Sequence, residues 1–87
     1  MDGAVLDPLA RIRPVIAEAY PDFASAMTPA TRFADHDIDS LDLMSLVIDV
    51  ETAFDLEFPS EAFERIETPG QLAEALDRQL AGTGGAA

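Results

Sequence analysis

The chain has 87 residues, no cysteine and no tryptophan, and a formal net charge of −12 from 17 acidic and 5 basic residues. Its length predicts one small domain, whose core must hold without disulfides or thiolate-bound metal. The charge disfavours nucleic acid and anionic lipid as partners, and no apolar stretch is long enough for a membrane span or a signal peptide. We expect a cytoplasmic monomer that does not insert into membranes and that binds basic partners.

A first helix is predicted from Asp7 to about Tyr20. An aspartate followed by proline is typical of a helix start, and apolar residues then recur at helical spacing, at Leu9, Ile12, Ile16 and Ala19. Pro14 lies inside this helix and should kink it. Residues 21–34 show no sustained period, so we expect a long ordered loop there, with Phe33 packed into the core.

A second helix is predicted from a cap at Asp39 to about Phe54, with Asp42 in its first turn, where an acidic side chain favours capping. Five apolar residues share its core face: Leu43, Leu46, Val47, Val50 and Phe54. Three others form an apolar strip on the opposite face: Leu41, Met44 and Ile48. Because acidic residues border this apolar strip, it is typical of a small docking surface.

Two more helices complete the prediction, a short one from Glu61 to about Glu64 and a last one that begins with a capping box at Thr68. Phe63 and Ile66 are expected to pack into the core. Residues 1–81 are then a single domain, and residues 82–87 a flexible, disordered tail. With no alternating strand pattern, the fold class is all-α: a four-helix bundle of three main helices, one short third helix and a long first loop.

Aspartates alternate from Asp35 to Asp39, as at the start of an EF-hand calcium loop. That loop needs glycine at its sixth position and glutamate at its twelfth, where this chain has Ser40 and Leu46. His36 lies close enough in sequence to Ser40 to suggest a hydrolase, but a lone histidine in a small bundle lacks a closed pocket and oxyanion donors. We therefore predict neither a metal site nor a catalytic residue.

A different interpretation is that Ser40 is an attachment point. A serine at the start of a helix is exposed and held in a defined orientation, and a phosphodiester on its oxygen would lie at the positive end of the helix dipole. The serine then needs only accessibility, because the modifying enzyme supplies the activation.

At these residues the chain resembles an acyl carrier protein. Asp39-Ser40-Leu41 matches the D-S-L modification motif of that family, and LDLMSLVIDVETAFDLEFP resembles the helix that follows and its exit. The spacing from Ser40 to Phe58-Pro59 agrees with the family without gaps, and residues 65–69 resemble the segment before its last helix. The resemblance covers residues 7–80.

This resemblance implies that Ser40, flanked by Asp39 and Leu41, carries 4′-phosphopantetheine, attached from coenzyme A by a magnesium-dependent phosphopantetheinyl transferase. The thiol of that arm holds acyl cargo as a thioester, so the protein needs no cysteine of its own. Where many members have leucine and glycine before the motif, this chain has His36 and Asp37.

The function implied is that of a stand-alone, non-catalytic carrier that delivers acyl intermediates to separate enzymes of fatty-acid, specialised lipid or polyketide biosynthesis. Basic patches on those enzymes are expected to dock on one set of residues: Leu41, Asp42, Met44, Ile48, Asp49, Glu51 and Asp55. Three alternatives stay open at this point: a carrier of amino acids charged by a dedicated ligase, an unmodified acidic helical adaptor, and a calcium sensor.

Overall fold

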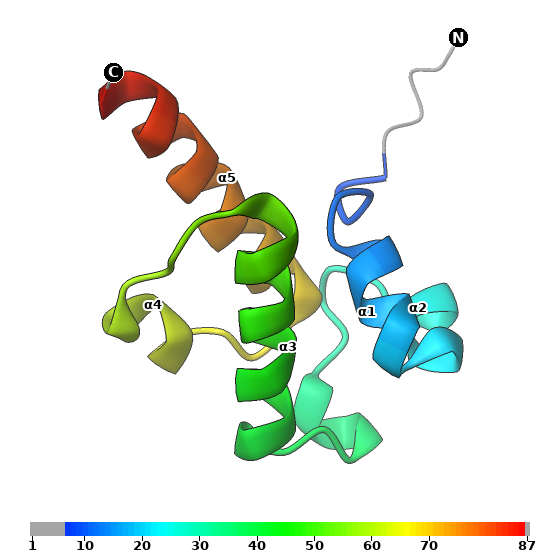
Figure 1. Cartoon of the computed structure of the whole chain (residues 1–87). Coiled ribbons are helices and arrows are strands. Elements are labelled where there is room, and N and C mark those ends of the chain that lie inside the picture. The colour runs from blue at the N-terminus through cyan, green and yellow to red at the C-terminus, as the bar shows by residue number, and fades with distance from the viewer. Residues whose placement is uncertain (1–6, 87) are drawn as a thin grey trace, which may run out of the picture.

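The computed structural model describes residues 7–86, with side chains up to Gly82, and forms helices and no strands over this range. The elements are α1 (Arg13–Ala19), α2 (Pro21–Ala26), a 3-10 helix (Phe33–His36), α3 (Ser40–Phe54), α4 (Ser60–Glu64) and α5 (Pro69–Ala86). In Figure 1, α3 stands in the middle, with α1 and α2 on one side and α4 on the other. The predicted all-α class is confirmed.

The first helix is shorter than predicted. Residues 8–12 form turns, in which the Leu9 carbonyl accepts hydrogen bonds from Ile12 N–H (3.1 Å) and Arg13 N–H (2.8 Å). Regular helix begins only at Arg13, which leaves Pro14 in the first turn of α1, where its missing N–H costs nothing. The expected kink inside one long helix is therefore wrong, although Asp7 does cap the turn by accepting from Leu9 N–H at 3.0 Å.

The expected long loop over residues 21–34 is also wrong in part, because α2 lies within it. Pro21 is the first residue of α2, and a six-residue helix is too short to show a hydrophobic period. The predicted plug is confirmed: Phe33 is 2% exposed, and its ring centroid lies 5.6 Å from that of half-buried Phe23. The 3-10 helix that follows leads into α3.

The predicted α3 is confirmed from its cap to its last residue. Asp39 Oδ1 accepts from Asp42 N–H at 2.9 Å, and Asp42 Oδ2 accepts from Asp39 N–H at 3.4 Å, which together form a capping box. Four of the five expected core residues are buried and Phe54 is half-buried; the four are Leu43, Leu46, Val47 and Val50. The helix ends at Phe54, and the residue that caps its carboxyl end, Asp55, has left-handed backbone with φ 55°.

The last two helices occur where the sequence places them. In the capping box of α5, Thr68 Oγ1 accepts from Gln71 N–H (3.2 Å) and Gln71 Oε1 accepts from Thr68 N–H (3.1 Å). Ile66 is buried as expected, whereas Phe63 is only half-buried. Helical backbone continues to Ala86, into the segment expected to be a disordered tail. The flexibility expected of residues 82–87 stays a prediction, and Ala87 lies outside the described residues.

The core lies between α3 and the remaining helices, and among residues 7–82 it contains no buried polar or charged side chain. Two backbone hydrogen bonds tie the chain before α3 to the start of α5: Phe33 N–H to Glu67 O (3.1 Å) and Gly70 N–H to Pro29 O (3.0 Å). No helix within residues 7–86 combines the length and apolar character that crossing a membrane requires.

Arg13 joins the first turns to the end of α2. Its Nε and Nη2 donate to the carboxylate of Asp7 at 2.8 and 3.1 Å, and its Nη1 donates to the carbonyls of Ala24 and Met27. The hydrogen bond from Arg13, helped by that from Leu9 N–H, lowers the pKa of Asp7 below its ordinary value of 3.8.

Asp7→Asn is expected to destabilise the protein at neutral pH, and the loss should shrink in acid. Because folding lowers the pKa of Asp7, its contribution is fully present above the ordinary aspartate pKa and disappears as pH falls through the lower, folded value. Urea unfolding of the wild type and of Asp7→Asn between pH 7 and about pH 3 measures the difference in their free energies of unfolding. Exposed Glu18→Gln is the control, and a difference that is the same at every pH would contradict the prediction.

Gly70→Ala is expected to lower the free energy of unfolding by about 1–3 kcal/mol, because a β-carbon has no room there. Built at Gly70, it would lie 2.7 Å from Pro29 O and 3.1 Å from Pro29 Cβ. The matched control is Gly82→Ala, where nothing lies within 4 Å and helix propensity should add about 0.5–1 kcal/mol. Urea denaturation measures both, and equal effects of the two substitutions would refute the steric argument.

Candidate attachment site at the start of α3

Ser40 is the first residue of α3, and its side chain is exposed. Its neighbours Asp39 and Asp42 cap the helix, and Ser40 Oγ makes no hydrogen bond to any residue within 7–82. The hydroxyl is therefore accessible and is not required for the fold. It also lies at the positive end of a 15-residue helix, which favours a negatively charged group on the oxygen.

The loop before Ser40 is held by two buried side chains, Phe33 and Ile38, and Ile38 N–H donates to Phe33 O at 3.2 Å. Between them, Asp37 has left-handed backbone with φ 64°. This is the position where many acyl carrier proteins have glycine, and the structure explains both residues: glycine adopts such a conformation freely, and aspartate is among the side chains that tolerate it.

His36 and the three loop aspartates do not assemble around Ser40. The imidazole of His36 packs edge-on against Phe23, with ring centroids 5.1 Å apart, and has no hydrogen bond to Ser40. Within the described side chains, no three carboxylate or imidazole groups lie close enough to share one metal ion. Asp39 instead caps α3, and Asp37 occupies the left-handed position of the loop before it.

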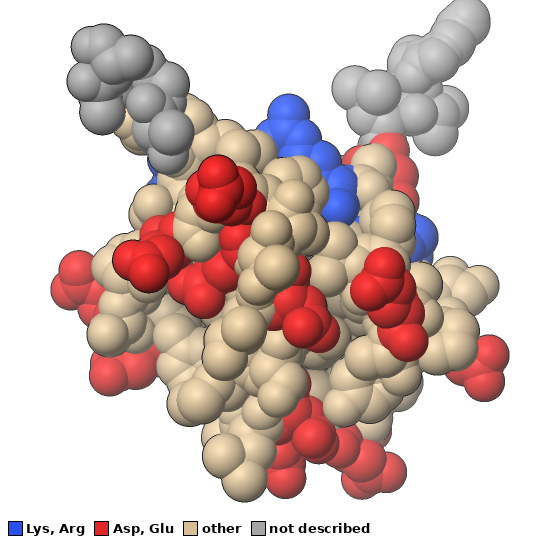
Figure 2. Space-filling view, in the orientation of Figure 1, with Lys and Arg blue, Asp and Glu red and all other residues tan. Residues whose placement is uncertain are grey.

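The apolar strip on α3 is exposed, as predicted. Leu41 is 73%, Met44 45% and Ile48 51% exposed, so neither α1 nor α4 covers them. Figure 2, in the orientation of Figure 1, shows acidic side chains on both sides of an uncharged ridge, with basic side chains only in the upper half. This face presents an apolar contact within a negatively charged surround.

Four acidic residues were predicted around this strip, and the structure separates them into two kinds. Asp49 and Asp55 are exposed and make no side-chain hydrogen bond or ion pair within residues 7–82. Asp42 belongs to the cap of α3, and Glu51 Oε2 accepts from Phe58 N–H at 2.7 Å, which fixes the connection to α4. The latter two carboxylates thus stabilise the fold as well as contributing charge.

Tyr20 is a neighbour of the site that sequence reasoning missed. It lies between α1 and α2 and is half-buried. Burial raises the pKa of its hydroxyl most, and the negative charges of Asp42 and Asp39 raise it further. The phenol therefore lies on the same side of the molecule as the start of α3. No periodicity could reveal this, because the proximity joins segments about 20 residues apart.

Comparison with known proteins identifies the family of the chain. The family model described as "Phosphopantetheine attachment site" matches residues 10–76, well over half of the chain. An acyl carrier protein of Amoebophilus asiaticus (strain 5a2) is 42% identical over 43 residues, which cover 49% of this chain and 54% of that relative. The aligned part of the chain thus spans about half the length of this curated relative.

These findings confirm the resemblance to acyl carrier proteins. Members of the matched family carry 4′-phosphopantetheine covalently and act as carriers, not as catalysts. The hydroxyl at the start of α3 is exposed and makes no hydrogen bond within residues 7–82, and it fits such a group because it is accessible to a modifying enzyme and lies where a phosphodiester is favoured. The chain therefore belongs to the phosphopantetheine attachment site family.

Proposed function

We propose that the protein is a stand-alone cytoplasmic acyl carrier protein, and that Ser40 is its attachment residue. The observation that carries this proposal is the hydroxyl of Ser40 within the D-S-L motif, exposed and without a hydrogen bond among the described residues. When attached, phosphopantetheine supplies the thiol that the chain lacks and on which acyl groups are held. The cargo would be intermediates of fatty-acid, specialised lipid or polyketide biosynthesis.

The residues around Ser40 support this role by position and charge. Backbone N–H groups in the first turn of α3 face the amino end of the helix, so they offset part of the repulsion between a phosphodiester on Ser40 and the carboxylates of Asp39 and Asp42. Among residues 7–82 no side chain hydrogen-bonds to this hydroxyl, which supports a mechanism in which the phosphopantetheinyl transferase removes its proton.

The attachment is tested by incubating the unmodified protein with coenzyme A, magnesium and a broad-specificity phosphopantetheinyl transferase. We expect the intact mass to rise by one phosphopantetheine, and peptide mapping to place the addition on Ser40. No mass change, or an addition on Ser45 or Ser60, would refute the assignment. Unmodified protein that nevertheless binds a basic partner tightly would favour the adaptor alternative.

We further propose that partner enzymes with basic patches dock on the apolar strip and its acidic border. Long-range attraction to Asp49 and Asp55 would speed encounter, and burial of Leu41, Met44 and Ile48 would fix the orientation. The exposed apolar area is small, so complexes should be short-lived and weaken with added salt, as a carrier that visits several enzymes requires.

Ile48→Asp is expected to lower kcat/KM of the transferase for this protein by about tenfold, because a charge replaces an apolar contact at the centre of the docking face. Ile48 is 51% exposed, so the fold should persist. The control is Ala81→Asp, which adds the same charge on exposed α5. Steady-state rates with each variant as the varied substrate test this, and equal rates for the two variants would contradict the docking role of the strip.

A further inference from the structure

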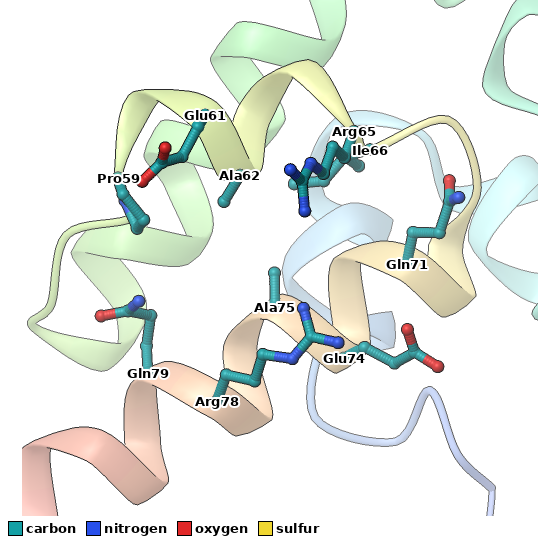
Figure 3. Close-up of a pocket in the computed structure, with 10 residues that line it drawn as sticks. All are labelled: Pro59, Glu61, Ala62, Arg65, Ile66, Gln71, Glu74, Ala75, Arg78 and Gln79. Atoms are coloured by element: carbon teal, nitrogen blue, oxygen red, sulfur yellow. The ribbon is translucent and has the colours of Figure 1, made fainter.

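A hollow of about 390 Å³ lies between α4 and the first half of α5, and Ser40 is not among the residues that line it. Its apolar floor includes Ile66 and Ala75, which are 4% and 8% exposed. Figure 3 shows the guanidinium groups of Arg65, at the end of α4, and Arg78, on α5, extending into the space between the two helices.

These two side chains differ from the other basic residues of the protein. All five basic residues are arginines, and three of them form ion pairs: Arg11 with Asp77, Arg13 with Asp7 and Arg32 with Glu67. Within residues 7–82, Arg65 and Arg78 form no ion pair and no side-chain hydrogen bond. In a chain with 17 acidic residues, the two unpaired cations thus line the same hollow.

The polar groups that point into the hollow are hydrogen-bond donors, the guanidinium groups of Arg65 and Arg78 (Figure 3). Two carboxylates, of Glu61 and Glu74, also belong to the lining and balance its formal charge. In Figure 3, however, Glu61 turns toward Pro59, and the carboxylate of Glu74 turns away from the gap between the helices. A guanidinium has five N–H donors and no acceptor, so two that face one space repel each other and are complemented by an oxyanion.

We propose that this hollow binds an organic oxyanion, a carboxylate or phosphate on a short apolar body, between Arg65 and Arg78. The charged end accepts hydrogen bonds from both guanidinium groups, and the apolar body lies against Ile66 and Ala75. The oxyanion comes either from a free metabolite or from the acidic end of an acyl group carried on the arm of the same chain. The second source rests on the proposed function, whereas the first does not.

The site is tested on the unmodified full chain by following the arginine Nε–Hε signals in nuclear magnetic resonance spectra. Sodium butyrate and inorganic phosphate are the two probes, each titrated at constant ionic strength with sodium chloride as balance. We expect saturable shifts at Arg65 and Arg78 with at least one probe, and none at the ion-paired control Arg11. Arg65→Gln or Arg78→Gln should each weaken binding by about tenfold, whereas Arg11→Gln should not.

The source of the oxyanion is distinguished by loading the arm. Protein charged with a succinyl group is compared with protein charged with a butyryl group, which has a similar length but no free carboxylate. Shifts at Arg65 and Arg78 only with succinyl support the tethered source, and shifts only in the titration support a free metabolite. Failure to load the arm would count against the proposed function while leaving the titration to decide the site. The proposal is overturned if the shifts grow linearly with probe concentration and equally at all arginines, and if succinyl loading shifts the signals of Arg65 and Arg78 no more than butyryl loading does.

Discussion

Ser40→Ala is expected to abolish phosphopantetheine attachment completely while leaving the fold unchanged. The hydroxyl is the proposed acceptor, so no mass increase should follow incubation with coenzyme A and the transferase. Stability should stay within about 0.5 kcal/mol of the wild type, because the side chain is exposed and the cap of α3 depends on Asp39 and Asp42. Intact mass and urea denaturation measure the two effects separately.

The matched control for this substitution is Ser45→Ala, at an exposed serine further along α3. Its modification rate should remain close to that of the wild type, because it leaves the hydroxyl, the cap and the apolar strip intact. A Ser40→Ala protein that still gains mass, or one that loses its fold, would show that the serine has a different role.

Phe33→Ala is expected to lower the free energy of unfolding by about 3–5 kcal/mol, the usual cost of removing a large buried aromatic side chain. Phe33 is 2% exposed and packs against Phe23; its backbone N–H donates to Glu67 O, and its carbonyl accepts from Ile38 N–H. Since small domains have about 5–15 kcal/mol in total, a substantial unfolded fraction should appear even at low urea concentration. The loop before Ser40 should loosen first.

Urea denaturation and near-ultraviolet circular dichroism measure this loss, with Phe63→Ala as the control. Phe63 is only half-buried and lies on the short α4, so its removal should cost clearly less. Equal losses for the two phenylalanines would mean that Phe33 is not the anchor of the loop.

The sequence predicted the parts of the fold that have strong local signals. Asp39 with Asp42, and Thr68 with Gln71, are capping residues at the correct spacing, and the apolar period of α3 is long enough to identify the buried face. The same period placed Leu41, Met44 and Ile48 on the exposed face.

What the sequence could not predict depends on short elements and on tertiary contacts. α2 has only six residues, and a proline at its start resembles a loop signal as much as a helix start. Pro14 was wrongly expected to kink a long helix, because its effect depends on where regular helix begins. Two tertiary contacts form only once the chain has folded: Tyr20 comes close to the acidic start of α3, and Phe58 N–H donates a hydrogen bond to Glu51 Oε2.

The reciprocal cap of α3 bears on whether modification of the protein would change its fold. The hydrogen bonds that start the helix come from Asp39 and Asp42, whereas the proposed attachment is at Ser40, so adding or removing a group there need not disturb the first turn of α3. On the proposed function, unmodified and loaded molecules would therefore interconvert without refolding, and a partner enzyme would meet the same capped helix start in either state.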